Sequence, residues 1–319
     1  MEQKEALEQE AKQRKREHGF QSQHMYTLAN YLKEEFGGRI AKLSFDAGFT
    51  CPNKDGRCGV GGCAFCSDDD AGGYYTGTPE EQKALTRYKW RDAKYLAYFQ
   101  SNTNTYAPVE VLRQAYDKAL QIEGVVGLAI GTRADCLPED VLSLLKEYHQ
   151  RTFLWVELGL QSIHPELRKE MNICCSMRQF EAGARSLIDA GIRTVIHIIL
   201  GLPGETREEM FQTVEYACSL KPFGIKLHMF NLIANSQLGR SYPNGCGLMS
   251  REEYVQLVVD LLERIPKEIV MHRLTGDPPE EGLIEPLWVR DKRRVLNEIQ
   301  KEFKRRGSYQ GDRAFGKAF

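Results

Sequence analysis

The chain has 319 residues, and 43 Lys and Arg residues against 44 Asp and Glu residues give it a formal net charge of −1 at pH 7. With 42% hydrophobic and 27% charged residues, the composition excludes a disordered chain and gives no bulk attraction to nucleic acid. No apolar run approaches the roughly 18 residues of a membrane helix, and residues 1–20 are too polar for a secretory signal, so we expect a cytoplasmic protein without membrane contact.

The chain begins with a charged segment. Residues 1–24 favour a helical N-terminal extension, in which the five bases of residues 1–20 are balanced by five acids. The segment has almost no apolar face, so we expect a solvated helix. The other end of the chain is more basic: residues 291–319 hold nine bases and four acids.

Six short β-rich runs alternate with helical patterns between the two ends. Several helices have readable capping boxes, in which a Ser or Thr precedes a Glu or Gln by three positions. This alternation predicts a parallel α/β architecture, although periodicity alone leaves a closed barrel, a partial barrel and an open sheet as alternatives. The expected strands are 40–45, 95–99, 125–130, 152–156, 194–200 and 225–230, and the capping pairs are Thr78 with Glu81, Ser176 with Gln179, Thr206 with Glu209, and Ser250 with Glu253.

The loop after the first strand gathers four of the nine cysteines. Cys51, Cys58, Cys63 and Cys66 fall within 16 residues of a Gly-rich segment, which is typical of a metal site because thiolates bind soft metals. A structural zinc site would use all four thiolates. An iron–sulfur cluster held by Cys51, Cys63 and Cys66 would instead leave one iron open, at a strand end where cofactors bind in parallel α/β folds.

This loop resembles the cluster loop of the radical S-adenosylmethionine (SAM) superfamily. The resemblance rests on Cys51-x11-Cys63-Ala64-Phe65-Cys66, and it extends over roughly residues 25–310 to the YhcC/YtqA-type family of the elongator catalytic-subunit-like branch. It implies a partial (β/α)6 TIM-like barrel over residues 25–235 and a C-terminal α/β extension with the basic tail over 236–319. The segments that carry the wider resemblance are 97–108, 131–142, 155–162, 197–206 and 272–279.

The resemblance also implies the cofactors and their sites. Cys51, Cys63 and Cys66 would bind a [4Fe–4S] cluster, and polar residues at the strand ends would bind SAM. Arg133, Lys226 and His228 are the candidate catalytic residues, although Arg133 also suits a structural pair with Asp135. The candidate SAM-binding residues are Gln100, Asn102, Thr103, Asn104, Thr132, Glu157, Gln161, Gly201 and Gly204.

The expected activity is reductive cleavage of SAM at the cluster to a 5′-deoxyadenosyl radical. The resemblance favours a wobble-uridine side chain of tRNA as substrate, in the aminomethyl-type 2-thiouridine pathway, and a donor such as flavodoxin or ferredoxin as electron source. We expect no acetyltransferase domain after the barrel. A small molecule or a peptide is the alternative substrate, and a zinc-binding nucleic-acid module is the alternative without redox chemistry.

Six of the nine cysteines stay outside this scheme, and three of them have more than one interpretation. Cys58 adds a fourth thiol to the loop, either as another metal ligand or as an extra group. The neighbours Cys174 and Cys175 are interpreted either as small buried hydrophobic residues or as a redox pair or ligands of a second cluster.

Overall fold

The computed structural model describes residues 24–68, 77–279 and 281–315. The charged segment predicted for residues 1–24 therefore lies outside the described residues, except for His24. Within the described ranges, no helix is long and apolar enough to cross a membrane.

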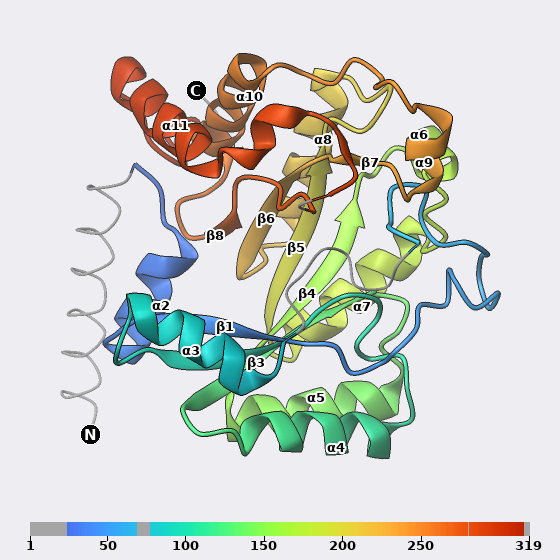
Figure 1. The fold of residues 1–319 in the computed structure, drawn as a ribbon, viewed down its shortest axis with the longest axis vertical. Coiled ribbons are helices and arrows are strands. Elements are labelled where there is room, and N and C mark those ends of the chain that lie inside the picture. The colour runs from blue at the N-terminus through green and yellow to red at the C-terminus, as the bar shows by residue number, and fades with distance from the viewer. Residues whose placement is uncertain (1–23, 69–76, 280, 316–319) are drawn as a thin grey trace.

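Seven parallel strands form one curled sheet in the order β1-β2-β3-β4-β5-β6-β8 (Figure 1). The six strands that the sequence predicts are all present, and the α/β partial barrel is confirmed. The seventh strand comes from the segment expected to form the C-terminal extension, and it pairs with β6. The strands are β1 Ile40–Phe45, β2 Lys94–Phe99, β3 Val125–Thr132, β4 Phe153–Gln161, β5 Arg193–Leu200, β6 Gly224–Met229 and β8 Val270–Arg273.

Helices cover the outer face of this sheet (Figure 1). The four predicted capping boxes are all present, at the starts of α3, α7, α8 and α10, because each Ser or Thr side chain accepts from the third backbone N–H of its helix. The longer helices are α3 Pro79–Lys89, α4 Val109–Leu120, α5 Glu139–Arg151, α7 Met177–Asp189, α8 Arg207–Ser219, α10 Arg251–Arg264 and α11 Lys292–Arg306.

Several shorter elements complete the fold. The helices α6 Pro165–Glu170 and α9 Gln237–Ser241 lie beside the cysteine loop, and a 3-10 helix spans Leu287–Arg290. Strands β7 Leu232–Ile233 and β9 Leu283–Glu285 pair antiparallel as a separate two-stranded sheet.

Helix α2, Leu28–Phe36, closes the amino end of the curled sheet. Its Leu32 is buried in one cluster with inward-facing residues of the strands, among them Leu96 and Trp155. The helix contacts both edge strands, β1 and β8, and the preceding residue Thr27 bridges to Met271 of β8. The inside of the half-barrel is therefore filled by side chains at its amino end.

Candidate active site

A cavity of about 370 Å³ opens at the carboxyl end of the sheet, opposite α2. This volume lies at the lower end of the range for small-molecule sites, which bind in this position in parallel α/β folds. The cavity brings together twelve of the fifteen predicted site residues: Cys51, Cys63, Cys66, Gln100, Asn102, Thr103, Thr132, Arg133, Glu157, Gln161, Lys226 and His228. Asn104, Gly201 and Gly204 do not line it.

The cysteine loop is fastened to the chain before α7 by two asparagines. The Asn172 side chain donates to the backbone oxygens of Val60 (3.2 Å) and Gly62 (2.6 Å). The buried Asn53 side chain donates in return to the backbone oxygen of Asn172 (2.6 Å) and lies 3.4 Å from the Cys63 sulfur. Asn172 has φ 50°, a left-handed conformation that Asn tolerates. These contacts fix the loop between Cys51 and Cys66.

Within the loop, the Cys63 and Cys66 thiols interact directly. The hydrogen bond with Cys66 and then burial raise the pKa of Cys63 well above its usual value, while the same hydrogen bond lowers the pKa of Cys66. Ligation of iron requires the thiolate form, so metal binding at this pair would release protons.

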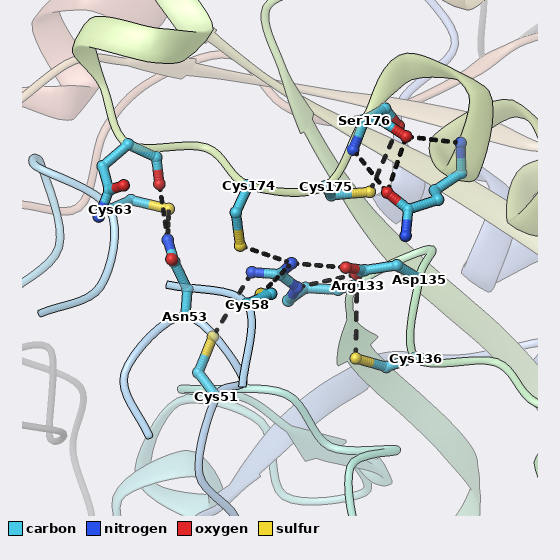
Figure 2. Close-up of polar contacts among 12 residues, drawn as sticks. Cys51, Asn53, Cys58, Cys63, Arg133, Asp135, Cys136, Cys174, Cys175 and Ser176 are labelled. Carbon is cyan, nitrogen blue, oxygen red and sulfur yellow. Dashed lines mark hydrogen bonds and ion pairs between the residues drawn. The ribbon is translucent and has the colours of Figure 1, made fainter. Parts of the chain in front are cut away.

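Arg133 lies among the other cysteine sulfurs (Figure 2). Asp135 holds its guanidinium through two contacts, Nε–Oδ1 of 2.9 Å and Nη2–Oδ2 of 2.6 Å, and the structural pair that the sequence offers as the alternative is therefore present. The same guanidinium lies 3.8 Å from the Cys51 sulfur, 3.4 Å from that of Cys58 and 3.2 Å from that of Cys174. Its catalytic role stays a prediction.

The donor set fits a cluster better than a single zinc ion. Cys51, Cys63 and Cys66 line the cavity, whereas Cys58 does not. Zinc would need four ligand atoms at about 2.0–2.3 Å from one point. An iron–sulfur cluster spreads its thiolates over several irons, and the three cysteines of the cavity would hold it.

The turn after β2 presents uncharged polar groups to the cavity. Ser101 and Asn102 have φ of 64° and 52°, so two successive residues adopt the left-handed conformation. Such strain is concentrated at functional sites. Gln100 donates to the Ser44 hydroxyl at 3.1 Å. Asn104 lies beneath the turn, because its amide donates to the backbone oxygens of Ser101 and Gly131 and it is almost fully buried.

A buried charge network forms the floor of the cavity. The Glu157 carboxylate, whose side chain is 4% exposed, accepts from Lys226 Nζ at 2.9 Å, Tyr98 Oη at 2.7 Å and Trp155 Nε1 at 3.0 Å, and Lys42 Nζ lies 3.5 Å away. Burial opposes ionisation, but the two lysines hold the pKa of Glu157 well below its usual value. Burial lowers the pKa of Lys42 to about 8.

These contacts bear on the predicted role of Glu157. A carboxylate offers about four acceptor positions, and four donors already surround this one. A ribose hydroxyl would have to compete with them, so the role of Glu157 in binding ribose stays a prediction. The structure does place Lys226 and His228 on the cavity side of β6, with Met229 in the core, as alternation along the strand predicts.

Histidines border the cavity beside this floor. The rings of His197 and His228 lie 5.4 Å apart, and Arg273 Nη1 lies 3.2 Å from His228 Nδ1. Burial, followed by the nearby charges of Lys226 or Arg273, lowers the pKa of both histidines well below its usual value, so both are neutral at pH 7. Arg273 also forms an ion pair with Asp277, which lines the cavity.

The Gly-rich turn after β5 lies outside the cavity lining. Glu205 clamps it, because one carboxylate oxygen accepts from the N–H groups of Gly201 (3.0 Å) and Leu202 (3.2 Å). Burial raises the pKa of Glu205 to about 8. Gly201 and Gly204 both have positive φ, 77° and 82°, which explains the glycines in this turn. Their predicted contact with SAM stays untested.

Four buried polar atoms that face the cavity have no hydrogen-bond partner among the residues that the structure describes. They are Thr103 Oγ1, Gln161 Oε1, His197 Nε2 and Asn231 Oδ1. Buried polar atoms almost always have a hydrogen-bond partner, so this group fits a polar ligand. The hydroxyl, amide and imidazole groups suit the uncharged and cationic parts of SAM, and the three thiols lie on the same cavity.

Two family models match the chain. The Radical SAM superfamily model covers residues 55–217, about half of the chain, and the Radical_SAM C-terminal domain model covers residues 222–305. The chain belongs to the radical SAM superfamily. Its relatives include the YtqA protein of Bacillus subtilis, 43% identical over 90% of this chain and 91% of that one, and the YhcC protein of Escherichia coli, 32% identical over 86% and 91%.

This radical SAM protein therefore belongs to the YhcC/YtqA-type family, as the cysteine loop and the strand-end segments together predict. Among solved structures it is similar to the Methanocaldococcus infernus Elp3 structure, with a TM-score of 0.61 and 17% identity over 85% of this chain and 64% of that one. It is also similar to Streptococcus suis SuiB bound to SAM, with a TM-score of 0.51 and 12% identity over 78% and 54%. These structures support the fold.

Family membership establishes the class of chemistry. Radical SAM enzymes use a [4Fe–4S] cluster and SAM, so this chain is an enzyme with those cofactors. It is therefore not a zinc-binding nucleic-acid module, which was the alternative without redox chemistry.

Several residues of the site are not apparent from the sequence. Lys42, Tyr98 and Trp155 complete the charge network, yet each lies within a strand and not at its end. The position of Lys42 in the middle of the first strand could have indicated the network, because a buried charge requires a partner of opposite charge. Asn172 gave no comparable signal, since its bonds join segments 110 or more positions apart.

Proposed function

We propose that this radical SAM enzyme modifies a wobble-uridine side chain of tRNA, in the aminomethyl-type 2-thiouridine pathway. Support comes from two tRNA uridine(34) acetyltransferases of Methanocaldococcus, one of which is 27% identical over 165 residues, half of this chain and 30% of that protein. The structural observation that carries the proposal is a basic helix that begins at the mouth of the cavity.

That helix is α11. Its first residue, Lys292, forms an ion pair with Asp277 of the cavity lining. Arg293, Lys301 and Lys304 are exposed on it and form no ion pair within the residues that the structure describes. At 3.6 residues per turn, these three side chains lie within roughly 80° on one face. A row of exposed cations suits a phosphate backbone.

The bound cofactors would supply one-electron cleavage of SAM to a 5′-deoxyadenosyl radical. Cys51, Cys63 and Cys66 would hold the cluster, while Gln100, Asn102, Thr103, Thr132, Glu157 and Gln161 would contact SAM from the cavity wall. Asn104, Gly201 and Gly204 would shape the turns behind them. Arg133, Lys226 and His228 would face the reacting groups, and the electron would come from a donor such as flavodoxin or ferredoxin.

The cofactor assignment is tested on full-length protein reconstituted anaerobically with iron and sulfide. Reduction in the presence of SAM should release 5′-deoxyadenosine. Cys51→Ala, Cys63→Ala and Cys66→Ala should each lose most cluster iron, whereas Cys58→Ala should keep it. Loss of iron from Cys58→Ala equal to that from the other three would contradict the three-ligand assignment.

The substrate is tested on tRNA from cells that lack the gene. Mass spectrometry of the nucleosides should show a wobble uridine without its side chain, restored by the wild-type gene but not by Cys63→Ala. Identical nucleoside profiles with and without the gene would contradict the tRNA proposal while leaving the SAM chemistry intact.

The role of α11 has its own test with matched variants. The triple variant R293E/K301E/K304E should bind tRNA more weakly and lower the slope of log affinity against log salt by about 2–3. The control K118E/K146E/R178E reverses three exposed cations on α4, α5 and α7, with α4 and α5 on the opposite side of the molecule from α11 (Figure 1). Equal effects of the two variants would remove α11 from the proposed surface.

A further inference from the structure

Two thiols of the cysteine cluster lie outside the cavity and have no part in the proposed chemistry. Cys58 is exposed on the loop after β1, and the partly exposed Cys174 lies between α6 and α7. Although they are 116 positions apart in the sequence, both sulfurs contact the same atom, Arg133 Nη2, at 3.4 and 3.2 Å (Figure 2).

The two sulfurs are also in direct contact with each other. Partial desolvation and then a hydrogen bond with Cys174 raise the pKa of Cys58 to about 12. The Arg133 guanidinium lies beside both sulfurs and makes their surroundings electropositive. Because Asp135 holds this guanidinium with two contacts, the arrangement does not depend on a freely moving side chain.

The other free thiols are placed differently. Cys136, Cys175 and Cys218 are buried, the partly exposed Cys246 lies between α9 and α10, and Cys51, Cys63 and Cys66 line the cavity as the proposed ligands. Cys58 and Cys174 thus combine three properties: mutual contact, access to solvent and independence from the cluster. Reactive cysteines are found in partly exposed, electropositive surroundings of this kind.

We propose that Cys58 and Cys174 are an oxidative modification site that forms a reversible disulfide on reaction with a peroxide. The Cys174 sulfur attacks one peroxide oxygen, the O–O bond breaks, and Cys174 sulfenic acid and water form. The Cys58 sulfur then attacks the sulfenic sulfur, the S–O bond breaks, and the Cys58 proton leaves with the hydroxyl as a second water. Two thiols and one hydrogen peroxide give one disulfide and two waters.

The disulfide would fasten the cluster loop covalently. Cys58 lies between the proposed ligands Cys51 and Cys63, while Cys174 follows Asn172, which already holds the same loop by hydrogen bonds. An oxidant that removes the cluster would therefore leave the loop bonded to the chain before α7. Reduction of the disulfide by a thiol would restore both free cysteine thiols.

The test uses full-length protein, stripped of iron by a chelator and reduced, then treated with one equivalent of hydrogen peroxide. After alkylation of free thiols and digestion without reductant, mass spectrometry should find the linked Cys58 and Cys174 peptides as the main cross-link. A thiol reductant should abolish it. The proposal is overturned if both cysteines stay alkylated while other thiols oxidise, or if Cys58 links chiefly to Cys51 or Cys63.

Three controls test whether the Cys58–Cys174 cross-link depends on the folded structure or arises from random pairing of thiols. Cys58→Ser should lose the cross-link and leave Cys174 sulfenic acid that dimedone traps, whereas Cys218→Ser should keep the cross-link. In 8 M urea the product should shift toward neighbours in sequence, because short loops close more readily in an unfolded chain. An equal yield of the Cys58–Cys174 link in urea would contradict the structural pairing. None of these measurements uses SAM or tRNA, so their outcome is independent of the proposed function.

Discussion

Replacing Glu157 by Gln should destabilise the protein by about 3–5 kcal/mol at pH 7. The side chains of Glu157 and Lys226 are 4% and 7% exposed, and Lys42 lies 3.5 Å from the same carboxylate. The amide of Gln can still accept from Tyr98 or Trp155, but it cannot neutralise the two ammonium groups. Removing one partner of a buried ion pair costs about 3–5 kcal/mol because it leaves an uncompensated charge.

The measurement is urea-induced unfolding of the cluster-free protein, followed by circular dichroism. Glu147→Gln is the matched control, since Glu147 also contacts two cations, Arg113 at 2.6 Å and Arg151 at 2.8 Å, but its side chain is 40% exposed. Solvent screens such a pair, so this control should remain within the small range of ordinary surface substitutions.

A double variant tests the physical reason. E157Q/K226M removes both charges of the closer pair, so no uncompensated charge of that pair is left buried, and the Gln side chain can still accept from Tyr98 or Trp155. It should therefore be more stable than Glu157→Gln alone. If Glu157→Gln costs no more than Glu147→Gln, or if the double variant is the least stable of the three, the network does not act as the geometry indicates.

Three further predictions concern other contacts. Burial lowers the folded-state pKa of Lys42 to about 8 from 10.5, so the folded protein binds fewer protons than the unfolded chain between these two pH values. Its stability relative to Lys42→Met should therefore rise by about 2 kcal/mol from pH 7.5 to 9.5. A stability difference that stays flat or falls would contradict this. Asn172→Gly should lower the free energy of unfolding by about 1–3 kcal/mol, because its hydrogen bonds are lost, and it should speed hydrogen exchange over residues 60–64. Asn172→Ala should cost roughly 1 kcal/mol more, because residue 172 has a φ of 50°. Exchange at the wild-type rate in both variants would show that Asn172 does not hold the cysteine loop. Gly183→Ala should cost about 1–3 kcal/mol in urea unfolding, because an added Cβ would lie 2.2 Å from the backbone oxygen of Ala134, whereas Gly38→Ala should cost less because nothing lies within 4 Å; equal losses would refute the packing argument.

The sequence predicts the six main strands because they are short β-rich runs between helical patterns, some of them apolar nearly throughout, as residues 194–200 illustrate. Strand β8 was missed because it spans only four residues, Val270–Arg273, two of them polar. Its pairing with β6 depends on the curvature of the whole sheet and on α2, neither of which a local pattern contains.

The candidate site is partly predictable for a similar reason. Polar residues at strand ends, such as Gln100, Arg133 and Gln161, do meet at the cavity, because carboxyl ends of parallel strands share one edge. Asn104 is likewise a polar residue after a strand, but its side-chain amide donates to the backbone oxygen of Ser101 in its own turn and does not line the cavity. Three of the four partners of Glu157, namely Lys42, Tyr98 and Lys226, lie on other strands, and only the register of the sheet brings them together.

Helix α2 also bears on the order in which substrates bind at the cavity. Because it contacts both edge strands and fills the amino end of the half-barrel, the cavity formed by the described residues opens toward the carboxyl edge. A macromolecule seated over that entrance would block exchange of anything behind it. Under the proposed tRNA function, we therefore expect sequential kinetics with the small cosubstrate first, and inhibition when the tRNA binds before it.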